Sequence, residues 1–171
     1  ALVGLRNGQA FYDSNLEATR QLVQTLNQTQ RQLKRLVFVS SIAAVDRPYQ
    51  QAPMPAEWDP LTEQDTPTPS TDYGRSKLEA EKLVKAAGLP YTTMRPAYIY
   101  GPYPRLGSTL DRVLQDLRSG KPYTRYPFPG KVSEIYVEDL ADALWTAATH
   151  EATINKTYFI ANPEPVSIAR F

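Results

Sequence analysis

The sequence contains no cysteine and only one histidine, His150. Without cysteine the chain can form neither a disulfide framework nor a thiolate metal site, and one histidine cannot build a histidine cluster. No metal site is therefore expected. No apolar run approaches the roughly 20 residues that a membrane-spanning helix needs, and no signal peptide opens the chain. These absences favour a cytoplasmic protein.

An excess of charge of either sign is also lacking. The chain has 19 lysines and arginines against 18 acidic residues, which gives a net charge of +1. This balance offers no electrostatic reason to expect a nucleic-acid or membrane partner. The 171 residues, of which 42% are hydrophobic and 22% charged, suffice for one domain with a sizeable core.

The residues that are present alternate between helical and extended patterns. The first elements predicted are a helix at 14–30, a buried parallel strand at 36–41, a long proline-rich loop at 46–71 and a helix at about 73–87. Further along we expect a strand at 91–102 that runs into a loop, a helix at 108–120, a strand at 133–137, a helix at 139–149 and a strand at 157–161. This order predicts an α/β fold with a mainly parallel sheet.

Two shorter patterns mark helix ends. Ser108 and Asp111 fit a capping box at the start of the helix at 108–120. The last residues, 165–171, have the pattern of a helix start.

The segment "STDYGRSK" places Tyr73 four residues before Lys77, on one face of a helix. A lysine cation beside a tyrosine lowers the tyrosine pKa. Lowering that pKa by about 3 units requires roughly 4 kcal/mol, after which the tyrosine can act as a general acid or base near neutral pH. A pair with this spacing is, however, more often an exposed surface pair, so the spacing alone leaves both interpretations open.

The order of several motifs adds a resemblance. The chain carries "VFVSSIAAV", a proline-rich loop, "YGRSKLEAEKLV" and then "LPYTTMRPAYIYGP". Together with "SNLEAT", "ALVGL" and "IYVEDLADAL", this series resembles the extended short-chain dehydrogenase/reductase family, also called the NAD-dependent epimerase/dehydratases. The resemblance implies a partial Rossmann-like fold, a doubly wound parallel sheet with a small C-terminal substrate-binding lobe. Residues 1–100 would form the catalytic half of the NAD(P)-binding domain, and residues 101–171 the lobe interleaved with the last Rossmann elements.

The resemblance also implies catalytic roles. Tyr73 would be the general acid/base, and Lys77 would bind the nicotinamide ribose and depress the pKa of Tyr73. Ser41 would hold the substrate oxygen, with Ser40 structural. Asn15 would support a relay behind the lysine, and the alternative for Asn15 is a helix N-cap.

The cofactor implied is NAD or NADP. Leu2, Val3, Gly4 and Ala97 would line it together with Tyr73 and Lys77, and Tyr98 would face the substrate.

The glycine-rich turn that holds the diphosphate in this family has no counterpart, since Gly4 and Gly8 do not fit the motif. We therefore expect a fragment that lacks the N-terminal dinucleotide-binding part and is inactive alone. Its first strand should have an unpaired edge and exposed apolar residues.

The activity implied is hydride transfer at a secondary alcohol or ketone of a small molecule. Tyr98 stands where sugar-nucleotide members commonly carry asparagine, and Val132 where they often carry arginine. Both departures favour the branch of 3β-hydroxysteroid dehydrogenases and dihydroflavonol reductases. The alternatives are an NDP-sugar epimerase or dehydratase, and a non-catalytic dinucleotide-binding sensor or scaffold. The substrate is open, as are the choice between NAD and NADP and whether the protein is a homodimer.

Overall fold

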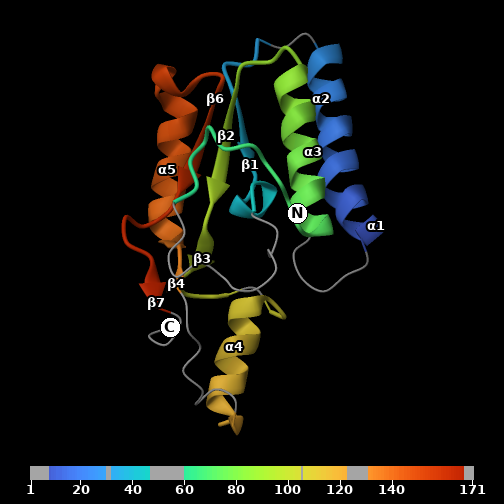
Figure 1. The fold of residues 1–171 in the computed structure, drawn as a ribbon. Helices are drawn as coiled ribbons and strands as arrows, with labels where there is room; N and C mark the ends of the chain where they lie inside the picture. Colours follow the sequence, from blue (N-terminus) through green and yellow to red (C-terminus); the bar gives the residue numbers. More distant parts are fainter. Residues whose placement is uncertain (1–7, 30–31, 47–59, 105, 123–130, 168–171) are drawn as a thin grey trace.

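The computed structural model describes residues 8–29, 32–46, 60–104, 106–122 and 131–167. Its centre is a parallel sheet in the order β1–β2–β6, built from Leu36–Val39, Tyr91–Pro96 and Lys156–Ile160. Helices α2 (Ala18–Gln28) and α3 (Asp72–Ala86) cover one face, and α5 (Val137–Thr149) covers the other (Figure 1). The α/β, Rossmann-like arrangement predicted from the sequence is confirmed.

Strand β2 is the middle strand of this sheet, and all of its residues are buried. It pairs with β1 through Phe38 and Thr93 and with β6 through Met94 and Tyr158. A middle strand with helices on both faces is shielded from water on every side, which explains its complete burial. Its polar side chains therefore need partners within the protein.

The core between the helices and the sheet is small and apolar. Val23 of α2 meets Val84 of α3 and Tyr91 at the start of β2. Four partly buried side chains pack around them: Leu36, Phe38, Leu83 and Ala87. Each side chain of this size contributes about 1.5–3 kcal/mol when fully buried, so this cluster joins α2 and α3 to the sheet.

The first helical segment is longer and less regular than predicted. It begins with α1 (Gly8–Phe11), continues as a π-helical turn (Tyr12–Glu17) and becomes α2 at Ala18. Asn15 lies inside the π-helical turn rather than before a helix, so its interpretation as an N-cap is wrong. π-helical turns occur frequently at functional sites.

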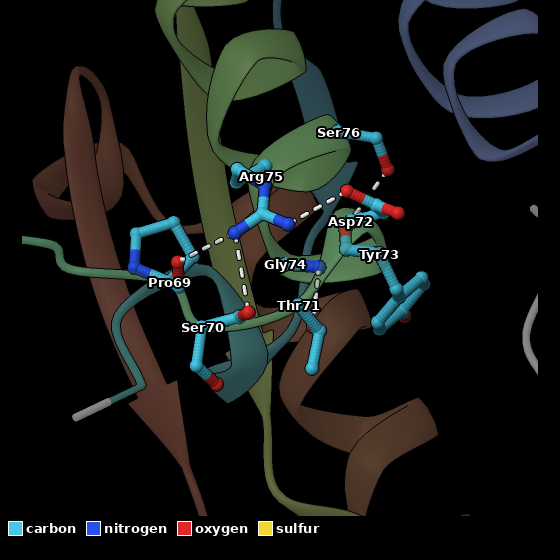
Figure 2. A network of polar contacts seen from close by, with 8 residues as sticks. All are labelled: Pro69, Ser70, Thr71, Asp72, Tyr73, Gly74, Arg75 and Ser76. Atoms are coloured by element: carbon cyan, nitrogen blue, oxygen red, sulfur yellow. Dashed lines mark hydrogen bonds and ion pairs between the residues drawn. The ribbon is translucent and has the colours of Figure 1, made fainter. Parts of the chain in front are cut away.

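Helix α3 starts and ends within one or two residues of its prediction. Thr71 caps it by accepting a hydrogen bond from the Gly74 N–H at 3.0 Å (Figure 2). The Arg75 guanidinium binds the Asp72 carboxylate at 2.7 Å and the preceding Ser70 carbonyl at 3.1 Å. These contacts fix the loop against the first turn of α3.

Shorter elements lie beyond the C-terminal ends of the sheet strands. β3 (Tyr98–Tyr100) pairs with β5 (Glu134–Tyr136), and β4 (Lys131–Val132) pairs antiparallel with β7 (Val166–Ser167). The expected helix start near the chain end is thus wrong where the structure describes it, because Val166–Ser167 is a strand.

Helix α4 (Thr109–Arg118) lies away from the main sheet (Figure 1). It is capped by Ser108, which accepts a hydrogen bond from the Asp111 N–H at 3.2 Å. The boundary proposed between residues 1–100 and 101–171 stays a prediction, although β6 shows that the later residues return to the main sheet. Within the described ranges, no helix has the length and apolar character needed to cross a membrane.

Candidate active site

The serine pair follows β1, where the carboxyl ends of the parallel strands meet. The Ser40 N–H continues the pairing with a 2.7 Å hydrogen bond to the Met94 carbonyl. Ser41 then caps a short 3₁₀ helix, Ile42–Ala44, and its hydroxyl accepts a hydrogen bond from the Ala43 N–H at 3.2 Å. This edge of an open α/β sheet is where such folds usually bind ligands.

Tyr73 lies in the first turn of α3, facing the serine. Its ring meets the Phe11 ring edge-on, with centroids 5.6 Å apart. Burial raises the pKa of Tyr73, and a hydrogen bond with the Ser41 side chain acts in the opposite direction. The structure therefore brings the side chains of Tyr73 and Ser41 together.

Lys77 follows one turn later and is buried, with 5% of its surface exposed. Its ammonium donates a 3.0 Å hydrogen bond to the Val39 carbonyl and lies 5.6 Å from the centre of the Phe38 ring. Burial lowers the pKa of Lys77, whereas the charge of Glu81 raises it. The lysine is thus directed at the end of β1.

Burial is the largest influence on the pKa of Tyr73 in the chain alone. The pKa of Tyr73 is raised rather than depressed, because burial of the phenol is the largest influence and the lowering influence comes from Ser41. The Lys77 ammonium is held on the Val39 carbonyl. The depressed pKa of Tyr73 that the resemblance implies therefore stays a prediction for the protein with its cofactor bound.

Asn15 is joined to Tyr73 through Ser76. The buried Asn15 amide donates to the Ser76 hydroxyl at 3.0 Å, and this hydroxyl donates to the Tyr73 carbonyl at 2.8 Å. The Asn15 side-chain oxygen is buried and has no hydrogen-bond partner within the described ranges. Asn15 therefore supports the backbone of the turn that carries Tyr73, whatever further role it has.

The remaining predicted residues are less tightly connected to this group. Ala97 is buried at the end of β2, where its N–H donates to the Ile160 carbonyl at 2.9 Å. Tyr98 lies opposite Glu134 in the small sheet, and partial burial raises its pKa. The three N-terminal predictions lie outside the described residues: Leu2, Val3 and Gly4.

Gly74 was not singled out from the sequence, although it determines how closely α3 approaches the serine loop. A Cβ atom added at Gly74 would lie 2.1 Å from the Ala43 carbonyl oxygen. Glu81 and Arg95 were also missed. The available signal was the presence of two charged residues in otherwise buried segments, since charged side chains are almost never fully buried unless they are paired.

The side chains around Lys77 suit the sugar end of a nicotinamide nucleotide. An ammonium carries three N–H groups, and one of those of Lys77 has a protein acceptor in Val39. Tyr73 adds a phenol on the same helix face. Donors of this kind at the carboxyl end of a parallel sheet fit a hydroxyl-rich ligand. These residues can hold the nicotinamide ribose end of the cofactor. The sequence shows no glycine-rich turn that could hold the diphosphate.

Comparison with known proteins gives a family match over most of the chain. The family model described as "NAD dependent epimerase/dehydratase family" matches residues 3–161. UDP-glucose 4-epimerase of Vibrio cholerae is 27% identical over 145 residues, which cover 80% of this chain and 41% of the relative. The chloroplast stem-loop binding protein of 41 kDa b of Arabidopsis thaliana is 29% identical over 112 residues, covering 63% of this chain and 28% of the relative. The chain spans less than half the length of these two relatives.

Solved structures share the fold. UDP-glucuronic acid 4-epimerase from Bacillus cereus, in complex with NAD, has a TM-score of 0.80 and 21% identity, covering 98% of this chain and 53% of that chain. A short-chain dehydrogenase/reductase superfamily protein from Agrobacterium tumefaciens with bound NAD has a TM-score of 0.75 and 18% identity, covering 100% of this chain and 60% of that one.

Proposed function

The chain belongs to the NAD dependent epimerase/dehydratase family, and on that premise we propose that it carries the proton-transfer site of an NAD(P)-dependent oxidoreductase. The reaction proposed is hydride transfer at a secondary alcohol or ketone of a small molecule. The observation that carries the proposal is the convergence of Ser41, Tyr73 and Lys77 at the carboxyl end of β1.

In this proposal the Tyr73 hydroxyl moves the proton. As a phenolate, Tyr73 removes the proton from a substrate alcohol, and as a phenol it gives one to a substrate ketone. The Ser41 side chain, which lowers the pKa of Tyr73, holds the substrate oxygen within reach of the phenol. Partial burial of Tyr73 keeps bulk water away from this proton path.

Lys77 would hold the ribose of the cofactor, and Ala97 would lie against it. When bound, the oxidised cofactor would supply a hydride acceptor with a cationic ring, and the reduced cofactor would supply the hydride. Because the pKa of Tyr73 is raised in the chain alone, the phenol needs further positive charge nearby to give up its proton at neutral pH. The Lys77 ammonium contributes to that charge when it is protonated.

The substrate class has two candidates. Tyr98 and Val132, at positions where sugar-nucleotide enzymes commonly have asparagine and arginine, support a substrate resembling a steroid alcohol or a dihydroflavonol. The names of relatives support a nucleotide sugar instead, since UDP-glucose 4-epimerase and UDP-glucuronic acid 4-epimerase are among the similar proteins. Both substrate classes can present a secondary alcohol to the same Tyr73 and Ser41.

A substrate panel tests the reaction and separates the two classes. The natural protein that carries residues 1–171 would be mixed with NAD or NADP and either UDP-glucose, a 3β-hydroxysteroid or a dihydroflavonol. Formation of the reduced or oxidised cofactor and conversion of the substrate would be followed, with Ser41→Ala as the variant.

We expect turnover of one class and a fall in kcat of about 10²–10³-fold in Ser41→Ala, with cofactor affinity unchanged. The same titrations by calorimetry would show which substrate binds, and tight binding of UDP-glucose would favour the epimerase candidate. Equal kcat in the wild type and Ser41→Ala would contradict the role of the serine.

A non-catalytic role is the proposal from a different class. One relative is named as a stem-loop binding protein, so binding of a nucleic-acid stem-loop is a suitable control measurement. The retention of Ser41, Tyr73 and Lys77 supports catalysis over that role. A cytoplasmic location and a small-molecule substrate complete the proposal.

A further inference from the structure

A buried ion pair joins α3 to the middle strand of the sheet. The Arg95 guanidinium donates two hydrogen bonds to the Glu81 carboxylate, at 3.0 Å from Nε and 2.7 Å from Nη2. The two side chains are 6% and 9% exposed. The same guanidinium lies 5.6 Å from the centre of the Phe159 ring. A bidentate pair of this kind fixes both the position and the orientation of the carboxylate.

Glu81 lies one helical turn beyond Lys77, and Lys77 lies one turn beyond Tyr73. Residues four apart share a helix face, so these three side chains form a row along α3 at the candidate site. Nevertheless, Lys77 donates its hydrogen bond to the Val39 carbonyl, while Arg95 engages both oxygens of Glu81. The arrangement keeps the carboxylate near the lysine without drawing the ammonium away from the end of β1.

The buried ammonium of Lys77 needs compensation for the loss of water. Lys77 donates its hydrogen bond to the Val39 carbonyl, which is neutral. Strand β1, Leu36–Val39, has no titratable side chain. The π-helical turn, which packs against α3, places the neutral Asn15 in the interior.

Other charged groups near Lys77 do not replace Glu81. The two acidic side chains of the π-helical turn, Asp13 and Glu17, are exposed, and Tyr73 is neutral while protonated. Arg95, from β2, carries the same sign of charge as Lys77. Among the described residues that face Lys77, Glu81 therefore supplies the negative charge, in agreement with its upward influence on the pKa of Lys77.

We infer that Glu81, held by Arg95, is a positioning residue that keeps Lys77 as an ammonium at the carboxyl end of β1. Glu81 touches neither substrate nor cofactor and acts through Lys77. The inference rests on the proposed function in so far as the charged Lys77 serves the reaction. It assigns to Glu81 and Arg95 a role beyond joining α3 to β2.

The test is an NMR titration of Lys77 in protein labelled at the lysine Cε, with the signal assigned through Lys77→Met. In Glu81→Gln the Arg95 cation loses its counter-charge, so the titration midpoint of Lys77 should fall by about one pH unit. In the double variant Glu81→Gln/Arg95→Met both charges are removed, and the midpoint should fall by less. Glu79→Gln is the matched control, because Glu79 lies on the same helix and pairs at the surface with Lys82 at 2.7 Å.

The titration midpoint of Lys77 should be highest, and equal, in the wild type and Glu79→Gln. It should be lower in the double variant and lowest in Glu81→Gln. If Glu81→Gln does not fold, the double variant, which removes the Arg95 cation together with its counter-charge, decides alone. A double variant that titrates like the wild type would overturn the inference and leave the pair a structural contact. The titration is carried out without substrate or cofactor, so its result does not depend on the proposed reaction. It can contradict the role of Glu81 while the activity tests support the proposed function, or support that role while the activity tests contradict the function.

Discussion

At the scale of single residues, Lys77 combines burial with a charge. Its ammonium is directed at the Val39 carbonyl, and burial lowers its pKa below the ordinary value of 10.5. Between the lowered value and 10.5 the unfolded chain binds more protons than the folded chain. The free energy of unfolding should therefore rise with pH across this window.

Replacing Lys77 by methionine should remove that rise. Methionine fills a similar volume without a charge to desolvate, so the Lys77→Met variant should show no gain in stability as pH approaches 10.5. The raised pKa of Tyr73 makes the free energy of unfolding fall as pH rises above 10.0. Both proteins keep Tyr73, so this fall is common to the two curves that are compared. Urea unfolding at a series of pH values measures the difference, and parallel curves for the two proteins would contradict the assignment.

Sequence reasoning predicted the residues of the site better than their electrostatics. Tyr73, Lys77 and Ser41 converge because the spacing of four on a helix and the position of a serine at a strand end are local properties. The raised pKa of Tyr73 depends on how much neighbouring chain covers the phenol, which no local pattern reveals. The pairing of Glu81 with Arg95 joins residues 14 positions apart on different elements, and it likewise requires the fold.

At the scale of elements, the contact between α3 and the 3₁₀ turn after β1 sets the distance between Tyr73 and Ser41. Gly74 makes the contact possible, because a Cβ atom there would lie 2.1 Å from the Ala43 carbonyl oxygen and 3.0 Å from the Pro69 Cβ. Backbone atoms on the opposing side cannot move as freely as a side-chain end. The helix would have to shift, and it would carry Tyr73 with it.

We expect Gly74→Ala to destabilise the protein by about 1–3 kcal/mol, the usual range for overpacking. The gain of about 1 kcal/mol that alanine brings in a helix interior should not offset this. The matched control is Gly8→Ala, whose added Cβ would meet the movable Asp72 carboxylate at 2.6 Å. Chemical unfolding of both variants provides the measurement. Equal stability of Gly74→Ala and wild type would show that α3 is not held at this distance by Gly74.

Most elements were predictable because their ends carry local signals. Thr71 and Gly88 mark the ends of α3, and Ser108 marks the start of α4. The π-helical turn around Asn15 was not predicted, since its i→i+5 bonding is rare and leaves no simple sequence period. The pairing of β4 with β7 was missed as well, because two-residue strands are too short to show alternation.

At the scale of the whole molecule, β1 forms one edge of the main sheet in the part that the structure describes. It pairs with β2, and Val39 at its end is 39% exposed. The expectation that the first strand has an unpaired edge is confirmed for the described residues, and Val39 is an exposed apolar residue on that strand. The chain also spans 41% of the length of the Vibrio cholerae relative, so activity in this account is tested on the natural protein that carries it.

The 171 residues alone should bind NAD and NADP weakly. A dinucleotide gains much of its anchorage from backbone N–H groups at a glycine-rich helix start, and the sequence contains no such turn. Calorimetric titration of the purified chain with each cofactor would show little heat at micromolar concentrations. Saturation in that range would mean that the site around Lys77 and Tyr73 suffices for cofactor binding.

The central claim is that Tyr73 moves the proton, and Tyr73→Phe tests it most directly. Phenylalanine keeps the ring that meets Phe11 at 5.6 Å and removes only the hydroxyl, whose pKa Ser41 lowers. In the natural protein that carries this chain, kcat should fall by about 10²–10⁴-fold, with cofactor affinity and unfolding midpoint close to wild type. An unchanged kcat with cofactor bound would contradict the account and assign the proton transfer to another group.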